Sequence, residues 1–168
     1  MSKANICVIG LSKLFTDYIC KQLSIRLDMF YANVEDILQF ELMDMEKVEA
    51  ICGIEYLMKE ERSVIRRVCS YDNTLINIDY SCLNNEYNIE VIRENCLIIY
   101  LKLDEKRFKK EQDKESINQS VKEINQDLLK DRDFMCCKFA DITVDCEEYN
   151  ENELSDIIIE KILKFYTK

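Results

Sequence analysis

Residues 96–101, with the sequence CLIIYL, decide the fold class of this chain. All six residues are apolar, so a strand that they form must be covered on both of its faces. Such strands are typical of the centre of a parallel sheet between two layers of helices. Residues 6–9, with the sequence ICVI, form a shorter run of the same kind and end at Gly10. The two runs therefore predict the inner strands of a parallel sheet.

Three further strands are predicted at residues 29–31, 74–79 and 142–144, and helical patterns separate all five strands. In the first helical pattern, apolar residues recur at every fourth position: Phe15, Ile19, Leu23 and Leu27. Further helices are expected at residues 34–45, 56–69, 88–94 and 104–131. Residues 116–119, SINQ, have the form of a capping box, so the last of these helices is expected to break and restart there.

A closing helix is expected after Asn150, which has Glu153 as its capping partner. The residues that this helix is expected to bury are Leu154, Ile158, Ile162 and Phe165. No hairpin signal joins any two strands, so the pattern predicts an α/β fold, a three-layer α/β/α sandwich with a five-stranded parallel sheet. The length of 168 residues suits a single domain, 1–168.

The composition excludes several classes of function. Lys and Arg number 23 against 33 Asp and Glu, and the net charge of −10 argues against nucleic acid or an anionic membrane as the main partner. The chain has no His, which excludes histidine-based nucleophiles, metal sites and proton shuttles. The nine cysteines are scattered without a C-x-x-C motif, and residues 6–9 are too short for a signal-peptide core. We therefore expect a cytoplasmic protein with reduced cysteines.

Several segments match the shikimate kinases in the same order along the chain. Residues 5–10, NICVIG, resemble the first strand of that family and the glycine that opens its phosphate loop. Residues 97–101 resemble its fourth strand, and residues 132–144 resemble its R-x-P-x-Y…A-D-x-T-V segment. The resemblance implies a P-loop kinase fold, with a phosphate loop at residues 10–17 and a lid at about residues 104–118. For an intact family member it also implies phosphorylation of shikimate with ATP and Mg²⁺.

The phosphate loop departs from the pattern G-x-x-x-x-G-K-S/T. In that pattern the glycines let backbone N–H groups surround the phosphates, the lysine neutralises them, and the hydroxyl binds Mg²⁺. Residues 10–17 read GLSKLFTD, so Phe15, Thr16 and Asp17 replace the second glycine, the lysine and the hydroxyl residue. We therefore expect that this loop does not surround an anion. The apolar residues expected to turn inward are Leu11, Leu14 and Phe15.

The other functional motifs of the family are also changed. The positions of its D-x-D pair hold Ala32 and Val34, and Leu57 replaces the arginine that binds the substrate carboxylate. Residues 79–81, DYS, replace a Gly-Gly-Gly substrate loop, and the chain has no Pro for the R-P motif of the lid. Arg132 is retained, and in the family this arginine lies beside the nucleotide base.

These losses favour a non-catalytic relative of the shikimate kinases, a pseudokinase with an interaction or regulatory role, an unidentified protein partner and no cofactor. Two alternatives stay open. One is an active, ATP- and Mg²⁺-dependent small-molecule kinase with an atypical phosphate loop, and the other is a sensor that binds a nucleotide or small anion without turnover. The residues that a nucleotide would contact in the degenerate loop and beside it are Gly10, Ser12, Lys13, Thr16, Asp17 and Arg132.

Five residues near this loop or near the retained arginine have competing interpretations. Lys13 either replaces the missing lysine or is an ordinary exposed residue. Asp17 and Asp79 either bind Mg²⁺ together, or they have structural positions in the first turn of a helix and at the end of a strand. The adjacent thiols of Cys136 and Cys137 are either reactive or buried and inert.

A basic helix face is the last candidate. Lys59, Arg62 and Arg66 are spaced i, i+3 and i+7, which places them on one face of the helix expected at residues 56–69. This face either binds an anionic ligand or the acidic patch of a partner, or it is solvated and paired with acidic neighbours such as Glu60 and Glu61.

Overall fold

The computed structural model describes residues 4–116, 126–147 and 149–167. Its centre is a five-stranded sheet in the order β2-β3-β1-β4-β5, in which every neighbouring pair of strands is parallel. The strands are β1 (Asn5–Gly10), β2 (Phe30–Asn33), β3 (Thr74–Asp79), β4 (Cys96–Lys102) and β5 (Ile142–Asp145). The predicted fold class is confirmed, and β1 and β4 are inner strands as expected.

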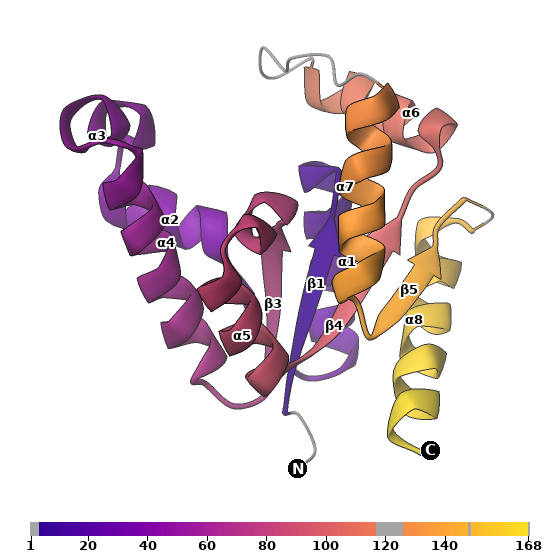
Figure 1. Ribbon diagram of the computed structural model, residues 1–168. Helices are drawn as coiled ribbons and strands as arrows, with labels where there is room; N and C mark the ends of the chain where they lie inside the picture. Colours follow the sequence, from indigo (N-terminus) through magenta and orange to yellow (C-terminus); the bar gives the residue numbers. More distant parts are fainter. Residues whose placement is uncertain (1–3, 117–125, 148, 168) are drawn as a thin grey trace.

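Helices cover both faces of the sheet (Figure 1). Helices α1 and α8 pack together on one face, whereas α4, α5 and α7 contact the strands from the other. The described helices are α1 (Lys13–Arg26), α2 (Val34–Leu42), α3 (Met45–Cys52), α4 (Ile54–Cys69), α5 (Glu86–Asn95), α6 (Glu105–Ser116), α7 (Gln126–Phe139) and α8 (Glu151–Tyr166), with a short 3-10 helix η1 (Tyr80–Asn84). None of these described helices is long and apolar enough to cross a lipid bilayer.

The core lies along the two inner strands that the apolar runs predicted. Val8 and Ile9 of β1 and Leu97 and Ile99 of β4 are completely buried. Tyr100 is also completely buried, and its hydroxyl donates a hydrogen bond to a carboxylate of α7 at 2.9 Å. A buried hydroxyl without a partner would cost free energy, and this hydrogen bond removes that cost. The bond also fixes the position of α7 relative to β4.

The helix predicted at residues 34–45 is wrong in one respect, because the chain forms two helices there. Met43 has a φ of 62°, a left-handed conformation that ends α2. The side chain of Asp44 then accepts a hydrogen bond from the backbone N–H of Lys47 at 2.9 Å and begins α3. An aspartate is a favourable N-cap residue, and its local preference outweighs the continuous apolar pattern.

Two other expectations need correction. In the helical region expected at residues 104–131, α6 ends at Ser116, where the sequence predicts a break, but the second helix, α7, continues past residue 131 to Phe139. Residues 117 and 118 of the expected lid lie outside the described residues. In α8 the capping box of Asn150 and Glu153 is confirmed, but Phe165 is 39% exposed rather than buried. Phe165 lies in the last turn of α8, where its ring packs edge-on against Tyr166.

Candidate ligand site at the carboxyl ends of the strands

A cavity of about 220 Å³ lies where the chain leaves β1, β2 and β3. Val34, Leu38 and Met45 form its apolar wall. Its remaining lining residues carry polar or thiol groups: Lys13, Glu35, Glu61, Asp79, Ser81 and Cys82. Ligands of open parallel sheets bind at the carboxyl ends of the strands, so this cavity is the candidate ligand site.

The cavity brings together residues that the sequence analysis selected from distant segments. Lys13 and Asp79 both line it. Val34 and Ser81, which stand at altered substrate motifs, line it as well. Asp17 and Arg132 have other neighbours. The structure therefore places some of the changed positions around one cavity, whereas Ala32 and Leu57 do not line it.

The N-terminus of α1 holds a carboxylate of the protein itself. Ser12 is the N-cap residue, and its hydroxyl donates a hydrogen bond to Oε1 of Glu115 at 2.7 Å. The backbone N–H of Leu14 donates to the same oxygen at 2.9 Å. A helix N-terminus has free N–H groups and a partial positive charge, which is why phosphates bind there. Here Glu115, near the end of α6, receives these donors.

The next donors of α1 are satisfied within the loop. The N–H of Phe15 donates to the hydroxyl of Ser12 at 3.4 Å, and the N–H of Thr16 donates to the carbonyl of Ser12 at 3.0 Å. The buried hydroxyl of Thr16 donates to the same carbonyl at 2.6 Å. A Cβ atom on Gly10 would lie 1.8 Å from Oγ1 of Thr16. Close packing against Thr16 is therefore enough to require glycine at this position.

The loop turns inward at two of the three predicted apolar residues. Leu11 and Phe15 are buried, whereas Leu14 is 50% exposed, so the expectation for Leu14 is wrong. The guanidinium of Arg107 lies 5.0 Å from the centre of the Phe15 ring and donates to two backbone carbonyls after β5. Arg107 thus connects α6 with both α1 and the segment that follows β5.

Lys13 is a charged residue among carboxylates. Its ammonium forms an ion pair with Glu35 at 2.7 Å, and its side chain is 59% exposed. Burial acts to lower the pKa of Lys13, but the bond to Glu35 and the negative charges of Asp79 and Glu115 outweigh it and raise the pKa above its ordinary value. Lys13 is therefore protonated, and its charge is already paired with Glu35.

Asp17 belongs to a hydrogen-bond network beside β2. One oxygen accepts from the hydroxyl of Tyr31 at 2.5 Å and from the amide of Asn33 at 3.3 Å, and the other pairs with Lys21 at 2.6 Å. Burial acts to raise the pKa of Asp17, but these three donors hold it below its ordinary value. Asp79 instead accepts a bond from η1 at 2.7 Å. The two aspartates have separate partners, and the described residues contain no group of three or more metal-ligating side chains.

The cavity itself is electronegative, because Glu35, Glu61 and Asp79 line it together with a single ammonium. Burial raises the pKa of Glu61, and the charge of Asp79 acts in the same direction against hydrogen bonds from Cys82 and Asn88. Like charges in a partly buried space repel further negative charge. The arrangement therefore disfavours an anionic ligand in this cavity.

The retained arginine and the adjacent thiols lie on α7. The guanidinium of Arg132 stacks over Tyr80, 4.1 Å from the ring centre. Cys136 is completely buried, and burial raises its pKa to about 12. Burial also raises the pKa of Cys137. A raised pKa leaves little thiolate at neutral pH, which supports the interpretation of inert thiols.

The three residues of the basic face lie on α4. Lys59 and Arg66 are exposed, and Arg62 is half-buried with its Nε donating to the carbonyl of Met58 at 3.4 Å. Among the residues that the structure describes, none of these three cations forms an ion pair. Lys59 and Arg66 are solvated, as one interpretation expects, but the ion pairs of that interpretation with Glu60 and Glu61 are not formed among the described residues.

The contacts that Glu115 and Arg107 make with α1 are the part of the site that sequence reasoning missed. Both lie in a charged stretch typical of a solvated helix face, and Glu115 is 101 positions from Leu14. The only available signal was indirect. A helix N-terminus without a bound phosphate requires another acceptor, and acidic side chains are the strongest candidates.

Comparisons with known proteins agree with this fold. A family model described as shikimate kinase matches residues 18–164. A curated protein named shikimate kinase, from Dehalococcoides mccartyi, is 24% identical over 169 residues, which cover 98% of this chain and 96% of that protein.

Solved structures give the same result at the level of the fold. The shikimate kinase from Acinetobacter baumannii in complex with shikimate matches with a TM-score of 0.84 and 16% identity, covering 99% of this chain and 97% of that one. The shikimate kinase from Aquifex aeolicus matches with a TM-score of 0.74 and 18% identity, covering 94% and 95% of the two chains.

Proposed function

The chain belongs to the shikimate kinase family, and we propose that it is a member that acts by binding other molecules and does not transfer phosphate. The observation that carries this proposal is the carboxylate of Glu115 on the N-terminus of α1. A nucleotide phosphate and this carboxylate compete for the same donors, so ATP would have to displace Glu115 before it could bind there.

The loop has no lysine at the family's position whose positive charge would offset the cost of displacing Glu115. The lysine position holds Thr16, whose hydroxyl is bonded to the carbonyl of Ser12. Phosphoryl transfer depends almost entirely on positioned positive charge around the transferred group. Loss of one such preorganised contact commonly costs about 3 kcal/mol of transition-state stabilisation. A loop without its lysine, and with a carboxylate in its anion site, is expected to support no measurable transfer.

The cavity also argues against shikimate as a ligand. Shikimate is a carboxylate, and the position of the family's substrate-binding arginine holds Leu57. The cavity presents Glu35, Glu61 and Asp79, and its single cation, Lys13, is already paired. An anionic substrate would therefore lose its hydration without gaining a free cation.

A second candidate function is ATP-dependent phosphorylation of a small molecule, because the names of the curated relative and of the matched structures favour an active kinase. In that case Glu115 must leave the helix N-terminus, and Lys13 must supply the missing charge from three residues before the lysine position. Lys13 lines the cavity, so this alternative makes a definite prediction about one residue.

A coupled ADP-release assay with Mg·ATP separates the two candidates. Shikimate and a panel of sugars and nucleosides serve as acceptors, and we expect no turnover above background. Saturable turnover that disappears in Lys13→Ala but persists in Lys47→Ala, an exposed lysine of α3, would establish the active kinase instead.

Thermal-shift titrations with Mg·ATP, ADP and shikimate complete the test. A ligand at one hundred times its dissociation constant stabilises the folded state by about 2.7 kcal/mol, which is easily measured. We expect no shift. A shift without turnover would instead support a sensor of nucleotides or small anions.

The basic face is the surface that the sequence analysis suggests for an acidic partner. Its three cations are Lys59, Arg62 and Arg66, and none forms an ion pair within the described ranges. The test is a pull-down with all three reversed to Glu. If the reversed protein retains every partner of the unmodified chain, this face is not the interaction surface.

A further inference from the structure

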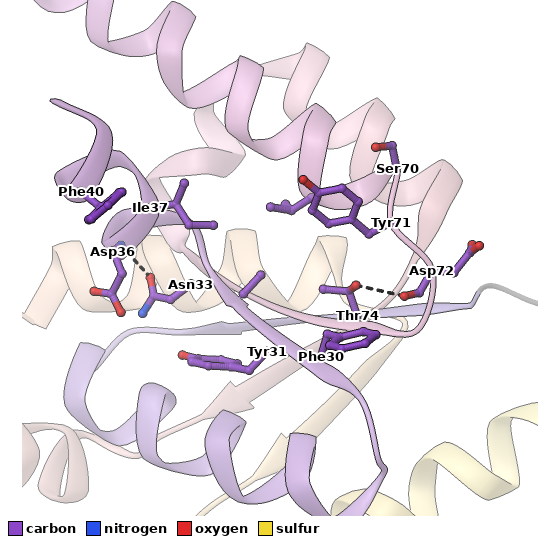
Figure 2. A pocket seen from close by; sticks show the side chains of 12 residues that line it. Phe30, Tyr31, Asn33, Asp36, Ile37, Phe40, Ser70, Tyr71, Asp72 and Thr74 are labelled. Atoms are coloured by element: carbon purple, nitrogen blue, oxygen red, sulfur yellow. Dashed lines mark hydrogen bonds between the residues drawn. The ribbon is translucent and has the colours of Figure 1, made fainter.

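A second surface of the molecule has the character of a binding groove. It lies beside β2, between α2 and the turn that follows α4, and it encloses about 930 Å³ (Figure 2). In Figure 2, Tyr71 faces Phe30 and Thr74 across the groove, and Phe40 lies at the end formed by α2. This groove is separate from the cavity at the carboxyl ends of the strands, and none of its lining residues lines that cavity.

Three large aromatic side chains of this groove are open to solvent. Phe30 is 74% exposed, Phe40 is 86% exposed and Tyr71 is 51% exposed. They come from β2, α2 and the turn after α4, so they are far apart in sequence but border one groove. β2 is the edge strand on this side of the sheet. Exposed aromatic clusters of this kind mark protein interaction sites, because burying them on a partner gains much of the binding energy.

The charged residues that line the groove are acidic. Asp36 and Asp72 line it, and Figure 2 places them toward opposite ends. None of the lining residues, all in the described part of the chain, is Lys or Arg. Lys21 is within the electrostatic reach of Asp36, but its ammonium is bonded to Asp17 at 2.6 Å. The two carboxylates are thus available to a positively charged partner, and the aromatic faces also attract cations.

We propose that this groove binds an extended segment of a partner protein in which large apolar side chains lie between Lys or Arg residues. The apolar side chains fill the space among Phe30, Phe40 and Tyr71, and the flanking cations pair with Asp36 and Asp72. The groove is open to solvent, which suits a chain segment better than a small molecule that needs enclosure on most sides. A second copy of this chain fits poorly, because its net charge of −10 repels an acidic groove. This inference is independent of whether the protein transfers phosphate.

Selection from a phage library of random dodecapeptides tests the proposal directly. The unmodified protein is the bait, and the double variant Phe30→Ser, Phe40→Ser is used for counterselection. Both residues are highly exposed, so their replacement leaves the core intact. We expect the enriched peptides to carry Lys or Arg on both sides of large apolar residues. Enrichment of acidic peptides, or no enrichment over the counterselected pool, would overturn the proposal.

The most enriched peptide is then synthesised with a fluorophore and titrated by fluorescence anisotropy. We expect Phe40→Ser to weaken binding at least about tenfold, as loss of an interfacial anchor does. The double variant Asp36→Asn, Asp72→Asn should weaken binding less and reduce its dependence on salt. Phe134→Ser is the matched control, because Phe134 is 73% exposed on α7 and distant in sequence from the groove. Equal loss in the control would refute the groove as the site.

Sedimentation of the protein alone tests whether a second copy of this chain occupies the groove. We expect no association that depends on Phe30 and Phe40. A dimer that forms with rising concentration and is lost in the double variant would show that the groove binds a second copy, and the proposal of a basic partner segment would then be wrong.

Discussion

Removal of the carboxylate of Glu115 should destabilise the protein measurably. In the folded chain one oxygen of Glu115 accepts from Ser12 at 2.7 Å and from the N–H of Leu14 at 2.9 Å. Hydrogen bonds to a charged group contribute about 1.5–3 kcal/mol when buried, and a charge at a helix N-terminus adds about 0.3–1 kcal/mol. Both bonds share one oxygen in a partly exposed place, where water can replace the carboxylate. We therefore expect Glu115→Ala to cost about 1–2 kcal/mol.

Urea titrations provide the measurement, with thermal melts as a second observable. For a chain of this size, 1 kcal/mol corresponds to a change in melting temperature of about 2–4 °C. Asp113→Ala is the matched control, because Asp113 is an exposed acidic residue of the same helix. Glu115→Gln should lie between the two, since it keeps an acceptor but loses the charge.

Inorganic phosphate adds a test that no general destabilisation can imitate. Glu115→Ala leaves the donors at Ser12 and Leu14 free for another anion, so phosphate should stabilise this variant more than the unmodified protein. If Glu115→Ala and Asp113→Ala are equally stable and respond equally to phosphate, Glu115 does not occupy the helix N-terminus. The main support for the non-catalytic proposal would then be lost.

Three further outcomes follow from contacts of the loop and of α1 and from the burial of cysteines elsewhere in the chain. Gly10→Ala should cost about 1–3 kcal/mol in urea titrations, because its Cβ atom would lie 1.8 Å from Oγ1 of Thr16, and adding Thr16→Ala should recover part of that loss. The pKa of Asp17 is lowered in the folded state, so the contribution of Asp17 to stability is present above its ordinary pKa and is lost as the pH falls through the folded pKa. The difference in the free energy of unfolding between the unmodified protein and Asp17→Asn should therefore shrink toward acid pH. A difference that does not change with pH would contradict this. Alkylation by iodoacetamide, followed by peptide mass spectrometry, should modify exposed Cys52 in the folded protein and Cys136 only on unfolding, because burial raises the pKa of Cys136 to about 12.

The sheet was predictable because the apolar pattern within a strand indicates on which faces that strand is buried. Residues 97–101 are apolar on both faces, a pattern typical of an inner parallel strand. The prediction of one continuous helix at residues 34–45 failed, because a local capping preference competed with the apolar pattern. Met43 and Asp44 interrupt an apolar periodicity that continues on both sides of them, and the break depends on one left-handed residue and one capping side chain.

The site was less predictable because its decisive contacts are long-range. The sequence shows that the lysine and the second glycine of the phosphate loop are missing, since Thr16 and Phe15 stand there. It does not show which group takes the place of the phosphate. That information requires the position of α6 relative to α1, and the position follows from packing rather than from any motif around Glu115.

The residues around the loop form a consistent electrostatic set. A helix N-terminus keeps its partial positive charge whatever residues surround it, so loss of phosphate leaves donors that need a new acceptor. Glu115 supplies that acceptor, and Arg107 on the same helix stacks on Phe15 at the former glycine position. An acidic side chain in this place would oppose a functional lysine loop, but it suits a loop in which the lysine has become Thr16. We therefore predict that Thr16→Lys alone does not give measurable binding of Mg·ATP, whereas Thr16→Lys combined with Glu115→Ala binds Mg·ATP more tightly than the single variant. Binding of Mg·ATP by the single Thr16→Lys variant, measured by thermal shift, would contradict this coupling.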